Sequence, residues 1–269
     1  MEKKNEKYTP EFEQVLDYCE KNCLFLGEGN PNGKILILGK ECAIKGFDFN
    51  DKEKAVAENN IKSWKKIIEN AFCIDTITEE FKKKELNLTN ITNDYYPLFP
   101  HLGQKCLQRR KEGTIGKGGT SPTWYFYQKL VDKIIGNPSK GKDNYIDFHT
   151  NCFHTELSQI PLSMSKQLPK DLEPLRKKSI ENRRELFRQK FFRQFPIVIL
   201  AVAHYPRDYS FDIQDVFDVE CIKQVSGPDW LNVHYQKSGN PRILIHTRQL
   251  SMISYEYIDK IAKEYHNRR

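Results

Sequence analysis

Long apolar runs are missing from this sequence of 269 residues, and no stretch reaches the roughly 18 apolar residues that suggest a membrane-spanning helix. The first seven residues, MEKKNEK, are mostly charged and no apolar segment follows them, so we expect no secretory signal. The seven cysteines stand at irregular spacings, and an odd number in a chain without such a signal indicates reduced thiols. These absences predict a cytoplasmic protein without a membrane partner.

Apolar residues are also scarce, at 38% of the chain, but 16 Phe, 13 Tyr and 3 Trp supply bulky side chains for a core, which argues against disorder over the whole chain. Acidic residues are outnumbered, because Lys and Arg total 43 and Asp and Glu total 36, a net charge of 43 − 36 = +7. This surplus favours polyanionic partners such as nucleic acid. No repeat or convincing linker divides the chain, so we predict a single domain over residues 1–269.

Short apolar runs without alternation are typical of buried parallel strands. Helical patterns with one apolar face lie between such runs, and a Ser-Pro pair marks the start of one of them. Strands separated by helices predict an α/β fold of three layers, in which helices cover both faces of a four-stranded, mainly parallel sheet. The predicted strands are 35–38, 145–151, 197–203 and 243–245, and the predicted helices are 61–72, 123–135, 174–195 and 254–265.

Two other kinds of segment interrupt this pattern. Between 219 and 236, two short runs flank the turn-forming sequence SGPD at 226–229, which predicts a hairpin or an added edge strand. The stretches 87–120 and 155–173 look irregular, and loops of that length in a compact domain are usually functional.

Polar residues follow each predicted strand at the point where it ends. They are GKEC at 39–42, TNC at 150–152, HY at 204–205 and TRQLS at 247–251. In an open α/β sheet, ligands bind beyond the carboxyl ends of the strands. We therefore expect these four segments to line one common cavity.

The residues around the first predicted strand carry a family resemblance. The sequence GEGNP at 27–31 leads into the strand at 35–38 and Gly39, and this opening resembles the iron–sulfur type of uracil-DNA glycosylase. The later strands and the closing helix follow in the same order up to residue 265. The resemblance implies a four-stranded parallel sheet between helices, and a protein that recognises a flipped or single-stranded base in damaged DNA and hydrolyses its N-glycosidic bond.

The motifs also depart from the family pattern. Where the family has Gly-Glu-x-Pro-Gly, this chain reads GKECA at 39–43, so the acid is displaced by one position. The closing motif has Arg248 in place of the family's His, and this permanent cation can stabilise the leaving base or bind a phosphate. Loss of turnover is therefore an open alternative.

Cofactor ligands are incomplete as well. Cys19 and Cys23 form a Cys-x-x-x-Cys pair, and no second pair follows Asn151, whereas a cubane cluster needs four thiolates. His149 and His154 have no neighbouring acid that completes a zinc site. We therefore expect no metal and no other cofactor.

The resemblance implies roles for individual residues. Glu41 would orient or deprotonate a water molecule, and Arg248 would stabilise the departing base. Gly39 and Asn151 would bind the base, with the Asn151 amide matching a pyrimidine edge. Stacking on the base would come from Phe47 or Phe49. Phosphate contacts are expected from Ser251, Lys117, Arg109 and Arg110.

Each role has a structural alternative. Glu41 also suits a helix N-terminus or an ion pair, and Asn151 suits a turn. The glycine-rich segment 113–120 around Lys117 lacks the Ser or Thr that follows the Lys of a phosphate-binding P-loop, and it suits a plain surface loop equally well. The basic helix at 174–195 is either a solvated face or a surface that follows a nucleic-acid backbone.

Three hypotheses about function follow. The first is a uracil-DNA glycosylase-like enzyme of DNA repair. The second is a catalytically inactive protein on the same fold that binds nucleic acid or a nucleotide. The third is an enzyme for small molecules whose positive charge is incidental. The salt dependence of binding to single-stranded DNA separates the third from the others.

Overall fold

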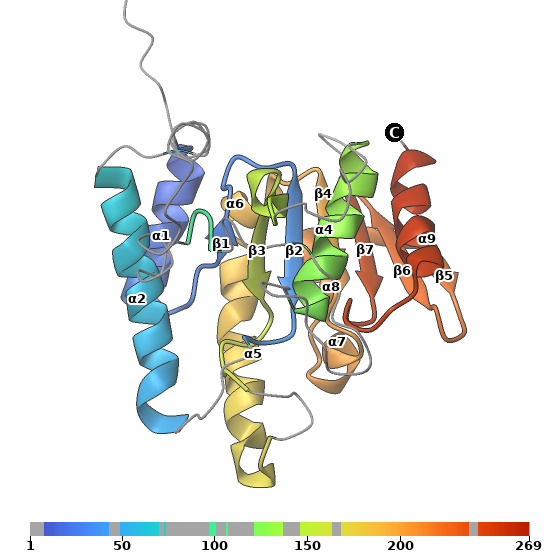
Figure 1. Cartoon of the computed structure of the whole chain (residues 1–269). Coiled ribbons are helices and arrows are strands. Elements are labelled where there is room, and N and C mark those ends of the chain that lie inside the picture. Colours follow the sequence, from blue (N-terminus) through green and yellow to red (C-terminus); the bar gives the residue numbers. More distant parts are fainter. Residues whose placement is uncertain are drawn as a thin grey trace, which may run out of the picture.

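The computed structural model describes residues 8–42, 49–69, 73, 97–100, 106, 121–136, 146–162, 168–236 and 242–268, with the side chains of the second helix described from residue 54 onward. These residues form a mixed α/β structure around one sheet (Figure 1). The predicted α/β class is confirmed. No helix in these ranges combines the length and the apolar character that crossing a membrane requires.

Seven strands of the described residues make up the sheet, in the order β1-β3-β2-β4-β7-β6-β5. The central strands β3, β2, β4 and β7 run parallel to one another, whereas β1 is antiparallel to β3, and β6 is antiparallel to both β7 and β5. The prediction of four mainly parallel strands is therefore wrong about the size of the sheet and incomplete about its directions. The strands are β1 (Glu28–Gly29), β2 (Ile35–Gly39), β3 (Cys152–Glu156), β4 (Ile197–Leu200), β5 (Glu220–Val225), β6 (Leu231–Tyr235) and β7 (Ile243–Thr247).

The hairpin predicted between 219 and 236 is confirmed by β5 and β6, which extend the edge of the sheet beside β7. At the opposite edge, β1 consists of only two residues and pairs with β3. Strand β2 lies between β3 and β4, so the chain leaves β2 toward one side of the sheet and then crosses to the other. Such a topological switch point is where α/β sheets hold their ligands.

Helices pack on both faces of the sheet, because successive side chains of a strand point in opposite directions. Leu36 and Leu38 of β2 belong to one apolar cluster, while Ile35 and Ile37 belong to the other. Helices α4 and α9 lie side by side against the second cluster (Figure 1). The main helices are α1 (Pro10–Asn22), α2 (Phe49–Glu69), α4 (Pro122–Ile135), α5 (Glu173–Phe187), α6 (Lys190–Arg193), α7 (Tyr205–Asp208), α8 (Ile213–Phe217) and α9 (Tyr255–His266).

The start and end of α4 follow from local chemistry. The Ser121 side chain accepts a hydrogen bond from the backbone N–H of Trp124, with Pro122 at the first helical position. Gly136 ends the helix with φ of 72°, a left-handed conformation that suits glycine. These are the boundaries that the sequence predicts.

The strand predicted at 145–151 is wrong. Phe148–Thr150 forms a turn of 3₁₀ helix, and β3 begins only after Asn151. The Oε1 atom of Gln128 on α4 accepts hydrogen bonds from the backbone N–H groups of Asp147 and Phe148, both at 2.9 Å. These bonds tie the segment to the helix rather than to the sheet. The stretch predicted to be irregular, 155–173, therefore begins inside a buried strand, because β3 extends to Glu156.

Candidate functional site

A cavity of about 590 Å³ lies at the carboxyl ends of β2 and β3. It is lined by residues from seven regions of the chain, among them Gly39 and Glu41 at the end of β2, Glu156 at the end of β3, Trp124 on α4, and Gln249 after β7. Its position matches the expected ligand site of an open α/β sheet. Two of the segments that we expected to converge, 39–42 and 247–251, do contribute to this one cavity.

The floor of the cavity is a buried cluster of carboxyl groups around an imidazole. Pairing of β1 with β3 sets Glu28 opposite His154. The His154 Nδ1 atom lies 3.4 Å from Glu28 Oε1, and its Nε2 atom lies 3.4 Å from Glu156 Oε1. The exposed fractions of Glu28, His154 and Glu156 are 8%, 2% and 5%, so water screens these charges little. This acidic floor is the main feature of the site that the sequence did not reveal.

Burial and mutual charge shift the ionisation of this cluster. Burial raises the pKa of Glu156 from its usual 4.5 to about 7, and the charges of Glu41 and Glu28 act in the same direction. Burial by itself would lower the pKa of His154, but the carboxylates of Glu156 and Glu28 raise it above its usual value overall. The floor therefore holds both an acid that exchanges its proton near neutral pH and an imidazole that favours its cationic form.

Glycine at position 39 makes room for this arrangement. A Cβ atom at Gly39 would lie 2.2 Å from Glu156 Oε2 and 2.9 Å from its carboxyl carbon. Register places the two residues opposite each other at the ends of β2 and β3. Gly39 thus permits the Glu156 carboxyl group to pack directly against the backbone of the neighbouring strand.

Replacing Gly39 with alanine is expected to lower the free energy of unfolding by about 1–2 kcal/mol, because the new methyl group overlaps the Glu156 carboxyl group. Urea titration of Gly39→Ala measures this change. The same substitution in a Glu156→Ala background should cost less than half as much, since the opposing side chain is gone. Equal costs in the two backgrounds would show that Glu156 is not the group that requires glycine there.

Glu41 is held by one of its two carboxylate oxygens. The Tyr205 hydroxyl donates a hydrogen bond to Glu41 Oε2 at 2.7 Å. The Tyr205 ring is itself flanked by Lys40, whose Nζ lies 4.7 Å from the ring centroid, and by Arg176, whose guanidinium carbon lies at 5.3 Å. Burial and then the Glu41 charge raise the pKa of Tyr205 far above its usual value, so it remains a donor. Glu41 Oε1 has no hydrogen-bond donor among the described residues.

Aromatic rings form a wall of the same cavity. Trp124 and Tyr127 come from the first turns of α4, and the Trp124 ring lies 5.0 Å from the His154 ring at an interplanar angle of 90°. Phe25 joins them from the segment before β1. The sequence pattern assigns Trp124 and Tyr127 to the core, because the apolar face of a helix does not reveal which of its rings meets a cavity.

Arg248 and Ser251 do not line this cavity. The Arg248 Nη1 atom donates to the Pro228 carbonyl oxygen at 3.1 Å and lies 3.6 Å from Asp229 Oδ1. Both partners belong to the turn of the β5–β6 hairpin, so Arg248 anchors that turn. Ser251 is half-buried in the segment between β7 and α9. In the same segment, Gln249 contributes the side chain that reaches the cavity.

Asn151 lies at the opposite end of the sheet from Gly39. It directly precedes β3, and its backbone carbonyl accepts hydrogen bonds from the N–H groups of Lys34 and Ile35, at the start of β2. Its neighbours line a separate cavity of about 290 Å³ that includes Asn30 and Lys34. The expectation that Asn151 shares a cavity with Glu41 is therefore wrong, because the strand follows Asn151 instead of ending there.

Four of the predicted residues fall outside the described residues: Phe47, Arg109, Arg110 and Lys117. Phe49 is the first residue of α2, and its side chain is outside them too.

Cys19 lies in the apolar core, where burial raises the pKa of its thiol to about 12, which opposes the thiolate form that a metal ligand needs. Within the described ranges no group of three or more His, Cys, Asp or Glu side chains is arranged to hold a metal ion.

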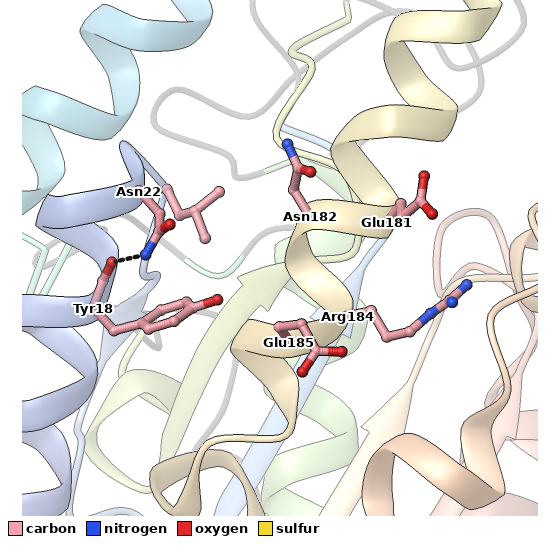
Figure 2. A pocket seen from close by; sticks show the side chains of 7 residues that line it. Tyr18, Asn22, Glu181, Asn182, Arg184 and Glu185 are labelled. Carbon is pink, nitrogen blue, oxygen red and sulfur yellow. Dashed lines mark hydrogen bonds between the residues drawn. The ribbon is translucent and has the colours of Figure 1, made fainter.

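A second cavity, of about 550 Å³, lies between α1 and α5. Tyr18 and Asn22 on α1 face Asn182 and Glu185 on α5 across it (Figure 2). Asn22 donates a hydrogen bond to the Tyr18 carbonyl oxygen at 2.8 Å within the helix. None of the residues that line the first cavity lines this one.

Neither the protein-family models nor the curated proteins that we searched contain a match for this chain.

Proposed function

We propose that this chain is a uracil-DNA glycosylase-like protein that receives a flipped or single-stranded base of DNA in the cavity at the ends of β2 and β3 and hydrolyses its N-glycosidic bond. The observation that carries the proposal is the Glu41 carboxylate. One of its oxygens is fixed by Tyr205 at 2.7 Å, and the other has no donor among the described residues, at the edge of a cavity walled by aromatic rings.

The size and lining of the cavity suit a nucleobase. Its volume of about 590 Å³ falls within the range of roughly 300–1,000 Å³ that is usual for small-ligand sites. Trp124 and Tyr127 offer faces on which a base can stack, which is favourable for every base. The formal net charge of +7 favours an encounter with the DNA backbone.

Four central parallel strands with helices on both faces support a glycosylase-type fold, in which β1 and the β5–β6 hairpin are additions at the two edges. The GEGNP sequence supports it as well, because it positions the floor of the cavity. Gly27 has φ of +132°, and a Cβ atom there would lie 2.5 Å from the His154 carbonyl oxygen, so glycine is needed at this turn.

The reaction requires a water molecule, a base that leaves and a group that carries charge. Glu41 orients the water and accepts its proton while the water oxygen attacks C1′ of the sugar. The bond from C1′ to the base nitrogen breaks, and its electron pair goes to the base. Negative charge develops on the departing base, and Lys40 and His154, which line the cavity, are positioned to stabilise it. They take the role that the sequence assigned to Arg248. A positioned carboxylate of this kind contributes about 10²–10⁴-fold to a rate.

One observation favours a binding protein without turnover. Arg248, the residue expected to stabilise the leaving base, is bonded to the hairpin turn at Pro228 and Asp229. Asn151 stands at the far end of β3. If Lys40 and His154 do not take over the stabilising role, the same cavity holds a base without cleaving it.

The test is cleavage of oligonucleotides that carry single uracil, hypoxanthine or other altered bases, followed by alkaline treatment at abasic sites. We expect cleavage by the native protein, and a rate about 10²-fold lower for Glu41→Gln, because the amide cannot accept the proton from water. Glu58→Gln is the matched control, since Glu58 is exposed on α2 beside Lys54. Tight DNA binding without cleavage of any substrate would select the binding protein, and absence of both would reject the proposal.

A further inference from the structure

An aromatic stack lies on the rim of the sheet beside the proposed site. The rings of His204, just before α7, and Trp230, just before β6, have centroids 5.2 Å apart and planes 16° from parallel. His204 follows β4, and α7 lies at the end of the sheet toward which the β7 arrow points (Figure 1). Trp230 reaches the same end because Leu231, the next residue, pairs with Thr247 at the end of β7. The stack and the cavity therefore share one edge of the sheet.

The backbone before His204 is held by β7. Ala203 has φ of 51°, in the left-handed region that residues with a side chain rarely adopt. Its N–H group donates to the Thr247 carbonyl oxygen at 3.0 Å, and its own carbonyl oxygen lies 2.7 Å from His246 Nε2. These two contacts maintain the turn that brings the His204 ring against Trp230.

Trp230 is held from the side of α9. Its carbonyl oxygen accepts a hydrogen bond from the Tyr257 hydroxyl at 2.6 Å. In the turn before it, the Asp229 carbonyl oxygen accepts a hydrogen bond from Lys260 Nζ at 2.6 Å, and Asp229 Oδ1 lies 3.6 Å from Arg248 Nη1. Because the stack is already ordered, a ligand that binds to it loses little free energy in fixing the protein.

The face of the His204 ring opposite Trp230, which we call its outer face, meets solvent. Trp230 covers one side of the imidazole, and His204 is nevertheless exposed. The next residue in the chain, Tyr205, holds Glu41 by the hydrogen bond at 2.7 Å. From the side of β7, Gln249 lines the cavity. The outer face thus stands beside the groups that form the proposed site.

We infer that the outer face of His204 binds the nucleobase next to the one in the cavity, so that the protein takes its substrate from single-stranded DNA. The inference rests on the proposed function, since it adds a second subsite for the same strand. Every base has a flat face, so stacking on an aromatic ring tolerates any sequence. In a duplex, the neighbouring base stays paired and stacked within its own helix, and contact with His204 would require a second base to leave that helix.

The test measures the affinity for a single-stranded oligonucleotide that carries one 2′-fluorinated deoxyuridine, which resists hydrolysis. A second oligonucleotide has abasic residues in place of both neighbours of the deoxyuridine, and a third probe is the duplex form of the first. Fluorescence anisotropy at one fixed salt concentration gives the dissociation constants. We expect the native protein to bind the first strand about tenfold more tightly than the second, which is the loss of one stacked base.

His204→Ala should bind the first strand about tenfold more weakly than the native protein and should no longer distinguish it from the second strand. Its affinity for the duplex should be unchanged. His204→Phe should restore the native preference, because it keeps a flat ring and removes the ionisable group. His266→Ala is the control, since His266 is an exposed imidazole at the end of α9 whose ring is tilted by 57° from that of Tyr265.

The inference and the proposed function fail in different ways. Binding of the first strand by His204→Ala with native affinity would overturn the inference, and Glu41-dependent cleavage would still support the proposed function. An equal loss on the duplex would also overturn it, because the contact would then not require a single strand. No binding of any of the three probes by the native protein would reject both.

Discussion

Replacing Arg183 with methionine is expected to lower the free energy of unfolding by about 3–5 kcal/mol, because the side chain is fully buried and satisfies three acceptors. Its Nε atom donates to the Glu156 carbonyl oxygen at 2.9 Å, and its Nη2 atom donates to Thr155 Oγ1 at 2.8 Å. Its Nη1 atom donates to the Phe25 carbonyl oxygen. Methionine fills a similar volume but leaves all three oxygens without a donor.

Arg184→Met is the matched control for this prediction. Arg184 is the next residue of α5, and its Nη2 atom donates to the Ser210 carbonyl oxygen at the surface. Its loss should cost less than about 1 kcal/mol, as surface substitutions usually do. Urea titrations of both variants give the comparison. Similar small costs for the two would mean that water replaces the Arg183 bonds, and that Arg183 does not hold the end of β3.

The role of Arg183 bears on the basic helix. A dense run of Lys and Arg at 174–195 predicts either a solvated face or a surface that follows a nucleic-acid backbone. In the structure, Arg183 is buried under the site, and Arg193 donates to the Val216 carbonyl oxygen. Arg188 is bonded to Glu185 and Asp215. These cations connect elements of the protein, so charge on this helix is a weaker argument for DNA contact than the sequence suggested.

Features set by neighbouring residues could be predicted from the sequence. The cap at Ser121, the end of α4 at Gly136 and the hairpin around 226–229 depend on local turn chemistry, and the structure contains all three. The apolar runs that became β2, β4 and β7 were equally clear, because strands buried on both faces have no polar positions to obscure them. Glu41 could be found for the same reason, as it stands two residues after the end of β2.

The acidic floor could not be predicted in this way. Strand β3 reads CFHTE, which looks too polar for a buried strand, and its polar residues are tolerated only because distant segments supply partners. His154 meets Glu28 of β1, and Thr155 meets Arg183 of α5. Those pairs depend on the β1–β3 register and on the packing of α5, which one sequence does not display. The available signal was Glu28, within the motif that carried the family resemblance.

The stability of the protein should depend on pH through Glu156. Its pKa in the folded state is about 7, and the usual value is 4.5, so the folded protein keeps this proton over a range in which the unfolded chain has lost it. The free energy of unfolding therefore falls as pH rises from about 4.5 to 7, and the full cost remains above that range. At about 1.4 kcal/mol for each unit of pKa, the cost is on the order of 3 kcal/mol.

Other buried groups contribute, and some act in the opposite direction. Burial lowers the pKa of His234 and of His246 to about 4, so these residues add stability as pH rises toward neutrality. The raised pKa of His154 acts with Glu156, because the stability it provides is lost as pH rises through its folded value. The total profile therefore mixes signs, and the difference between the native protein and a Glu156 variant isolates Glu156 together with the effect of its charge on His154.

Glu156→Gln supplies that difference, because it removes one ionisation and keeps the shape of the side chain. From pH 5 to pH 8, the stability of the variant relative to the native protein is expected to rise by roughly 2–3 kcal/mol, as only the native protein must bury a carboxylate above pH 7. Urea titrations at each pH measure it, with Glu185→Gln as the exposed control. A constant difference between the two proteins across this range would show that Glu156 ionises as readily in the folded protein as in the unfolded chain.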